Sequence, residues 1–350
     1  MKVLMDILTP KHARFLSRLG DRLRSRGVAV SYTTRDYYES KRMLRLLGIR
    51  ATVLGRWGGT TLEKALFSAQ RTEAYVKLLA DMKPDLVFSF GSPEAARASF
   101  GLSIPHMMAN DSPHAEAVMR LTVPLSSKLF APWVIPKETW TRFGILESDV
   151  VQYRGLDQAA WMKDLEIADS GIRPKERLLV IYRPEEFKAA YVSSQVPSSA
   201  KMVRQTLEIL RRKLGREVML VVLGRYGHSR MYHRLLGSSA RIPRGPVDGI
   251  EQLKSASAFL GCGGTMTGEA ALSGIPTISL SQHPNLVEKF LIREKLVFQP
   301  SSAEDIADLI SAFHEDDEKS RQLRERASSL LRKMEDPTEK ICAFLLKWRS

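Results

Sequence analysis

The residues best suited to chemistry form one glycine-rich segment, Gly261-Cys262-Gly263-Gly264-Thr265-Met266-Thr267-Gly268-Glu269, which follows an apolar run. Glycines permit a tight turn and let a ligand approach the backbone amides. A helix that begins behind such a turn offers unpaired N–H groups and the positive end of its dipole, which suits a phosphate. We therefore expect the turn to bind the diphosphate of a nucleotide through Gly263, Gly264, Thr265, Met266 and Thr267. Glu269 would then accept hydrogen bonds from ribose hydroxyls in the first helical turn.

A plainer interpretation of the same segment is a helix cap. Thr265 and Glu269 would then serve only the helix start, and the glycines only the turn. Two adjacent glycines exceed what a cap requires, which favours the ligand site. The segment is neither a GxGxxG fingerprint nor a Walker loop.

Two arginines of the second half also follow strand-like runs, as the glycine-rich segment does. Arg183 follows the strand-like run 178–182, where a guanidinium can hold a phosphate with two hydrogen bonds. Arg225 follows the run 218–223 and would contact the base or a phosphate. The alternatives are a surface arginine and a mobile loop, respectively.

Three segments of the first half also follow apolar runs and precede helical patterns. They contain these candidate residues: His12, Gly91, Ser92, Asp111 and His114. In an open α/β sheet the carboxyl ends of the strands share one edge, where ligands bind. An Asp with a nearby His is a workable general base. We expect His12, or Asp111 with His114, to deprotonate an acceptor.

Some of these residues have local roles as alternatives. Ser92-Pro93 and Ser112-Pro113 each place a serine before a proline at the first helical position, which is a capping signal. Gly58 and Gly59, after Arg56, are expected to form a further loop at the cleft.

The scaffold that positions these segments is predicted from alternating strand-like and helix-like runs. The pattern runs from 2 to about 131 and restarts near 177, which indicates two parallel sheets covered by helices. We predict an α/β architecture of two Rossmann-like doubly wound domains facing a central cleft. The expected domains are 1–155 for acceptor and catalysis and 156–335 for the nucleotide sugar, followed by a C-terminal helix, 336–350.

Composition restricts the class of protein. The chain has 350 residues, an apolar fraction of 44% and a formal charge of +14, so anionic partners are favoured over neutral ones. The alternative is a solvated basic surface. Cys262 and Cys342 lie far apart without metal spacing, which indicates a reducing compartment. No apolar run is long enough to span a bilayer, and a cytoplasmic location is expected, with peripheral attachment at the inner membrane face as an option.

Several reaction classes lack their motifs. The sequence contains no HExxH, CxxC, GxSxG, Walker or EF-hand pattern, so neither a metal ligand set nor a serine hydrolase is indicated. We expect no tightly bound cofactor. The basic helices have no interleaved aromatic residues, which makes nucleic acid an unlikely partner.

The chain resembles the family called domain of unknown function 354, in four motifs that keep their order. These are Asp6-Ile7 with His12; Gly91-Ser92-Pro93-Glu94-Ala95-Ala96; Asp111-Ser112 with His114-Ala115-Glu116; and Gly263-Gly264-Thr265-Met266 with Glu269-Ala270-Ala271 and Gly274-Ile275-Pro276. That family is similar in fold to GT-B enzymes such as UDP-GlcNAc 2-epimerase and the lipid-linked GlcNAc transferase of peptidoglycan synthesis.

The resemblance implies a GT-B-like architecture in which the second domain binds a nucleotide sugar, with a UDP-sugar favoured, and the C-terminal helix 336–350 packs back on the first domain. The acceptor is left open; the positive charge of the chain is compatible with a lipid-linked acceptor at a membrane surface. The resemblance also implies chemistry without a protein-bound metal. The epimerase has an acidic residue and a serine before its paired glycines, where this chain has Gly261 and Cys262. We therefore expect a glycosyltransferase. A UDP-sugar 2-epimerase or hydrolase is the alternative, and a non-catalytic nucleotide- or nucleic-acid-binding protein is the second alternative.

Overall fold

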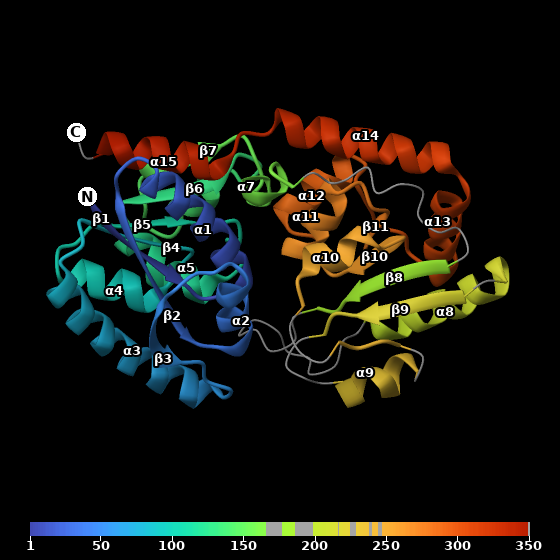
Figure 1. Ribbon diagram of the computed structural model, residues 1–350, viewed down its shortest axis with the longest axis horizontal. Coiled ribbons are helices and arrows are strands. Elements are labelled where there is room, and N and C mark those ends of the chain that lie inside the picture. The colour runs from blue at the N-terminus through green and yellow to red at the C-terminus, as the bar shows by residue number, and fades with distance from the viewer. Residues whose placement is uncertain are drawn as a thin grey trace. The chain divides into compact units, whose positions relative to one another are not determined.

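The computed structural model describes residues 1–165, 177–185, 199–215, 217–224, 229–237, 240–243 and 247–348. It consists of two compact units (Figure 1). Unit 1 comprises Met1–Trp161 with Met334–Ser350, and unit 2 comprises Met162–Lys333. The boundaries expected from the sequence, 155 and 335, lie close to these divisions.

Unit 1 is built on a seven-stranded parallel sheet with the order β3-β2-β1-β4-β5-β6-β7. Its strands are β1 Lys2–Ile7, β2 Ala29–Asp36, β3 Thr52–Arg56, β4 Leu86–Ser89, β5 His106–Ala109, β6 Lys128–Pro132 and β7 Val150–Tyr153. Its α-helices are α1 Pro10–Arg24, α2 Tyr38–Leu46, α3 Thr61–Met82, α4 Pro93–Gly101, α5 Glu116–Thr122, α6 Glu138–Thr141, α7 Ala159–Met162, which crosses the boundary, and α15 Pro337–Trp348. Two short 3₁₀ helices, Val123–Leu125 and Glu147–Asp149, precede β6 and β7.

Helix α1 illustrates how the sequence specifies this unit. Thr9 caps it by accepting a hydrogen bond from the His12 amide, and Pro10 occupies its first turn, where the missing N–H costs nothing. Its apolar side chains recur at helical spacing and are fully buried: Phe15, Leu16, Leu19 and Leu23. Burial of this stripe holds α1 against the sheet.

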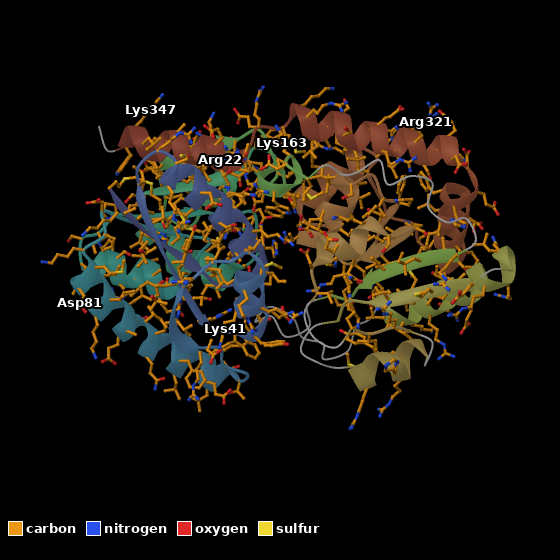
Figure 2. The ribbon with its side chains drawn as sticks, viewed as in Figure 1. Arg22, Lys41, Asp81, Lys163, Arg321 and Lys347 are labelled. Atoms are coloured by element: carbon orange, nitrogen blue, oxygen red, sulfur yellow. The ribbon has the colours of Figure 1, made fainter. Side chains whose placement is uncertain are left out.

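The C-terminal helix α15 packs on α1, although the two are separated by the whole of unit 2 in sequence. Arg22 of α1, which is labelled in Figure 2, makes three polar contacts with the start of α15 and the residue before it. Its guanidinium donates to Thr338 Oγ1 at 3.0 Å, Glu339 Oε2 at 2.8 Å and Asp336 Oδ2 at 2.5 Å. Unit 1 is therefore completed by the end of the chain.

Unit 2 contains a five-stranded parallel sheet with the order β12-β11-β10-β8-β9. Its strands are β8 Arg177–Arg183, β9 Glu217–Val222, β10 Ala258–Gly261, β11 Thr277–Ser279 and β12 Val297–Phe298. Its remaining helices are α8 Ala200–Leu214, α9 Ser229–Leu236, α10 Gly249–Lys254, α11 Thr265–Leu272, α12 Leu286–Arg293, α13 Ala303–Glu315 and α14 Asp317–Lys333. Two apolar clusters lie on opposite faces of the sheet; Val180 belongs to one and Ile181 to the other.

Each sheet reverses its strand order at one point, and such a point opens a crevice at the carboxyl ends of the strands. In unit 1 the reversal lies between β1 and β4, which end beside Thr9 and Phe90. In unit 2 it lies between β8 and β10, where Arg183 and Gly261 are directly paired. Both predicted sites thus fall at a topological switch point.

Two details of the predicted elements are wrong. Helix α11 begins at Thr265, so Glu269 lies past the first helical turn, where the dipole acts less strongly. Helix α5 begins only at Glu116, and Ser112 does not cap it. Instead, the Ser112 amide donates to Asn110 Oδ1 at 2.7 Å and closes a local turn.

Within the part of the chain that the structure describes, no helix is long and apolar enough to cross a membrane. The same residues contain no cluster of three or more His, Cys, Asp or Glu side chains that could hold a metal ion.

Candidate functional site

The glycine turn of unit 2 has the backbone that the sequence predicts. Gly263 and Gly264 have φ of 82° and 86°, a region that side chains rarely adopt. Gly264 occupies the N-cap of α11 and has no side chain with which to cap the helix. No described atom lies within 4 Å of the position that a Cβ on Gly264 would take. The start of α11 is therefore open to an anion.

Thr267 lies in the first turn of α11 and is 1% exposed. Its hydroxyl has no hydrogen-bond partner among the described residues. Gly261 is directly beside it, because a Cβ there would lie 3.0 Å from Thr267 Oγ1. A buried hydroxyl without a partner costs free energy, which a ligand oxygen could recover.

Glu288 is a second buried polar group at the turn, one that the sequence reasoning missed. It lies in the first turn of α12, where Asn285 Oδ1 accepts a hydrogen bond from its amide. One carboxylate oxygen lies 3.0 Å from where a Cβ on Gly263 would be, and the other has no partner among the described residues. Burial raises the pKa of Glu288, although hydrogen bonds with Ser279 and the Asn285 backbone oppose the shift. Its protonation is thus sensitive to a neighbouring anion.

The other predicted residues of unit 2 are placed as follows. Arg183 lies across from the turn, and its guanidinium donates to the Leu223 carbonyl at 2.6 Å, which fixes it at the switch point. Glu269 is buried on α11. Met266 lies against Gly249, where a Cβ would meet its Cε at 3.0 Å. Arg225 lies outside the described residues.

Cys262 is held beside a carboxylate. Its thiol donates to Glu185 Oε2 at 3.4 Å, and burial raises the pKa of the thiol. The same carboxylate accepts from the Ser199 hydroxyl at 2.5 Å and the Ser199 amide at 3.2 Å. Cys262 is thus a neutral side chain of the turn.

In unit 1, His12 stacks on Phe90 with ring centroids 5.0 Å apart. The Leu8 amide donates to His12 Nδ1 at 3.4 Å, which assigns the proton of the neutral ring to Nε2. Burial and the neighbouring Lys11 ammonium lower the pKa of His12 to about 3. The imidazole is therefore neutral at pH 7 and offers an N–H donor.

The carboxylate of Asp111 is bound by a residue that the sequence reasoning missed. Lys11 Nζ lies 2.6 Å from Asp111 and 2.6 Å from Asp157, and the Tyr153 hydroxyl donates to Asp157. Burial raises the pKa of Asp157 to about 6, with Asp111 contributing further. Although burial opposes it, Lys11 holds the pKa of Asp111 below its usual range. The two carboxylates and the ammonium form one coupled group, the Lys11 cluster.

His114 is exposed, and its electrostatic influence on Asp111 is weaker than that of Lys11. Partial desolvation by the surrounding atoms lowers the pKa of His114. The Ser112 hydroxyl donates to Asp111 at 2.8 Å. Asp111 is therefore oriented chiefly by Lys11 and Ser112.

A buried ion-pair network supports this edge of the sheet. Arg71, 2% exposed, donates to Asp6 at 2.6 Å and to Glu94 at 2.9 Å. It also donates to Ser92 Oγ at 3.3 Å, and Ser92 caps α4 by accepting from the Ala95 amide. Although burial opposes it, the Arg71 guanidinium holds the pKa of Asp6 below its usual range. Ser92 thus has the capping role.

The three remaining glycines serve the backbone. Gly91, with φ of 85°, leaves room for Asn110, whose amide nitrogen would lie 3.3 Å from a Cβ there. Gly58 and Gly59 precede a capping box on α3, in which Gly59 donates to Glu63 Oε2 at 2.8 Å. A Cβ on Gly58 would lie 2.5 Å from the Lys64 nitrogen, so this turn requires glycine.

The missed residues differ in the signal that could have found them. Asn285 three residues before Glu288 is a capping pattern that marks a helix start. Lys11 stands within a segment already chosen for His12. Asp157 and Arg71 give no such signal, since their partners lie far away in sequence.

The chain is similar to known proteins over nearly its whole length. It is 25% identical over 359 residues to the uncharacterized protein MJ0665 of Methanocaldococcus jannaschii, covering 99% of both chains. It superimposes on the UDP-GlcNAc 2-epimerase of the same organism, solved with UDP-GlcNAc and UDP, with a TM-score of 0.73 and 16% identity, covering 99% of this chain and 100% of the other. The glycotransferase of kitacinnamycin gives a TM-score of 0.63 at 12% identity, with 99% and 98% covered.

The fold is therefore α/β and GT-B-like, as predicted from the sequence. Residues 1–345 match a single family, and the match includes every motif on which the resemblance rests. The chain belongs to the family described as Protein of unknown function (DUF354).

Proposed function

We propose that this protein is a glycosyltransferase that uses a nucleoside-diphosphate sugar. The observation that carries the proposal is the turn before α11. Two consecutive glycines with positive φ expose the helix start, and the buried Thr267 hydroxyl beside it has no partner among the described residues. A diphosphate would accept hydrogen bonds from both.

In the proposed reaction an acceptor hydroxyl attacks the anomeric carbon of the sugar. The bond from that carbon to the diphosphate oxygen breaks, and the nucleoside diphosphate leaves. Negative charge develops on the diphosphate, where the start of α11 stabilises it. Arg183, fixed at the same switch point, is positioned to contribute a cation.

The acceptor proton needs a base, and we assign that role to Asp111. It is ionised, partly exposed and oriented by Lys11. Because the Lys11 cluster titrates as one unit, Asp157 can share the proton that Asp111 receives. His12 is neutral with its proton on Nε2, so it is better suited to donate a hydrogen bond than to accept a proton.

The nucleotide to test first is UDP, because a similarly folded epimerase was solved with UDP-GlcNAc and UDP. Gly264→Ala adds one methyl group where φ is 86°. Gly237→Ala is a matched control in the same unit, since φ is 89° and a Cβ there also has open space. Each variant should lose about 1–3 kcal/mol of stability from a backbone with positive φ, which at Gly264 is combined with ψ of −168°, a region that is occupied essentially by glycine.

Isothermal titration calorimetry with UDP and UDP-GlcNAc then separates strain from binding. We expect Gly264→Ala to weaken binding at least tenfold and Gly237→Ala to leave it unchanged. Absence of wild-type binding at millimolar UDP, GDP and their sugars would refute the proposal.

A sugar-nucleotide 2-epimerase is the second candidate, because structures of that activity superimpose on nearly the whole chain. Incubation of UDP-GlcNAc with the protein alone distinguishes the two. Conversion without an acceptor supports the epimerase. Binding without conversion, with or without acceptors, supports a non-catalytic nucleotide-binding protein.

A further inference from the structure

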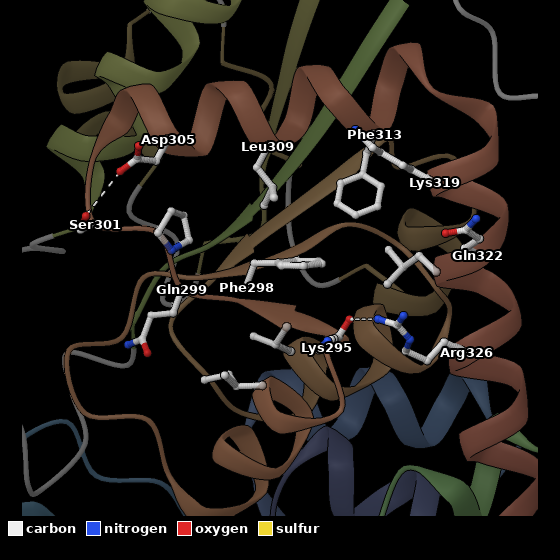
Figure 3. A pocket seen from close by; sticks show the side chains of 14 residues that line it. Lys295, Phe298, Gln299, Ser301, Asp305, Leu309, Phe313, Lys319, Gln322 and Arg326 are labelled. Carbon is white, nitrogen blue, oxygen red and sulfur yellow. Dashed lines mark hydrogen bonds between the residues drawn. The ribbon is translucent and has the colours of Figure 1, made fainter.

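A groove of about 680 Å³ lies in unit 2 between β12, α13 and α14 (Figure 3). It shares no lining residue with the glycine turn. Its volume is within the range of small-molecule sites, about 300–1,000 Å³. We call it the β12 groove, since β12 is the edge strand of the sheet.

The interior of the β12 groove is apolar. Phe298 of β12 and Phe313 of α13 both project into it, with ring centroids 5.4 Å apart (Figure 3). Leu309 and Leu323 extend the apolar surface from α13 and α14. Phe298, Phe313 and Leu309 are only partly buried, so this surface remains accessible. A ligand that covers it gains hydrophobic free energy.

The rim of the groove is mostly basic. Lys295, Lys319 and Arg326 line it, against one acidic residue, Asp305. Arg326 donates to the Lys295 backbone carbonyl at 3.4 Å, so the guanidinium lies beside the residue that carries the second cation. Lys319 is only loosely paired, at 3.7 Å from Asp316. An anionic group is therefore favoured beside Lys295 and Arg326.

We propose that the β12 groove binds a single-chain amphiphile with an anionic head group. The alkyl chain lies along Phe298 and Phe313, and the head group lies between Lys295 and Arg326. A free phosphate would leave the aromatic surface unused, and an uncharged chain would leave the cations unused. This inference does not depend on transferase chemistry.

The probe is dodecyl phosphate below its micellar concentration, measured by isothermal titration calorimetry on the full chain. Decyl phosphate, uncharged dodecyl maltoside and inorganic phosphate are the comparison ligands. Each buried methylene contributes up to about fourfold in affinity, from roughly 0.8 kcal/mol per CH₂. We expect dodecyl phosphate to bind several-fold more tightly than decyl phosphate and at least tenfold more tightly than the other two.

Two variants, with three substitutions between them, test the geometry. Lys295 has φ of 55°, so Lys295→Gly removes a cation at a position whose backbone suits glycine. The double variant Lys295→Gly/Arg326→Gln should have an affinity for dodecyl phosphate at least fivefold lower than that of the wild type. Gln322→Trp places an indole in the groove from an exposed position of α14 and should reduce binding at least tenfold.

Arg321→Gln is the matched control, because Arg321 is an exposed arginine of α14 outside the groove (Figure 2). It should leave affinity unchanged. Equal binding of dodecyl maltoside, or full competition by inorganic phosphate, would overturn the proposal. An unaltered affinity of Gln322→Trp for dodecyl phosphate would also overturn it. The same holds if the wild type sediments as a dimer that Gln322→Trp dissociates, because the groove would then bind a second copy of the chain.

Discussion

The unpartnered hydroxyl of Thr267 leads to a prediction in which stability and binding change in opposite directions. Thr267→Val replaces the hydroxyl by a methyl group of similar shape. Since Thr267 is 1% exposed and its Oγ1 lacks a partner among the described residues, the free protein loses no hydrogen bond. Removing a buried unsatisfied hydroxyl should stabilise it by about 1–3 kcal/mol.

The same substitution should weaken the binding of the nucleotide. A hydrogen bond to a charged group contributes about 1.5–3 kcal/mol, so affinity for UDP should fall about 10- to 150-fold. Stability is measured by guanidinium unfolding, and affinity by calorimetry. In thermal unfolding each kcal/mol should appear as a shift of about 2–4 °C for a unit of this size.

Thr206→Val is the matched control for this experiment. Thr206 is also fully buried in unit 2, but its hydroxyl donates to the Met202 carbonyl at 2.9 Å. Its substitution should not stabilise the protein and should leave UDP affinity unchanged. If Thr267→Val instead destabilises the free protein and binds UDP normally, the hydroxyl is structural and the reasoning about the turn fails.

Three further predictions concern the titratable groups. Arg71→Met should lower the free energy of unfolding by about 3–5 kcal/mol, measured in urea or guanidinium, because it leaves the Asp6 carboxylate buried without its cation. Adding Asp6→Asn should recover part of this loss. A loss below about 1 kcal/mol would contradict the buried ion pair. Burial raises the pKa of Glu288, so the folded state binds more protons than the unfolded state, and stability is lost as pH rises above the ordinary value of about 4.3. Glu288→Gln should therefore gain stability relative to wild type between pH 4 and pH 8; parallel pH profiles would show that the carboxyl is not perturbed. Asp111→Asn should lower kcat for transfer by about 10²–10⁴ with UDP affinity unchanged, and a variant with normal turnover would exclude Asp111 as the base.

The strands that carry the site could be predicted because parallel strands buried on both faces read as continuous apolar runs. The apolar run before the glycine-rich segment is β10, Ala258–Gly261. The elements absent from the prediction are short or mixed in character. β12 has two residues, and β7 has four, one of which is the polar Gln152. Neither provides a run long enough to distinguish from a loop.

The backbone conformation of the glycine turn could be predicted from the sequence, whereas the contacts between side chains could not. Paired glycines after a strand predict positive φ, as Gly263 and Gly264 have. Lys11 and Asp157 form an ion pair although they are far apart in the sequence of unit 1, so no local spacing predicts this contact. Arg71 lies in the middle of a long helix, where a charge ordinarily faces water, and only the fold reveals its burial.

The position of α15 has a consequence for synthesis on the ribosome. Unit 1 is discontinuous, and its α1 surface stays uncovered until the last helix emerges. At about 5–20 residues per second, the intervening unit delays that helix by roughly 10–35 s. During this interval nascent unit 1 lacks the partners of Arg22 and the buried apolar face of α15 that Ile341 and Leu345 provide. Apolar surface exposed in this way favours aggregation, so a chain without α15 should aggregate more readily than the full chain.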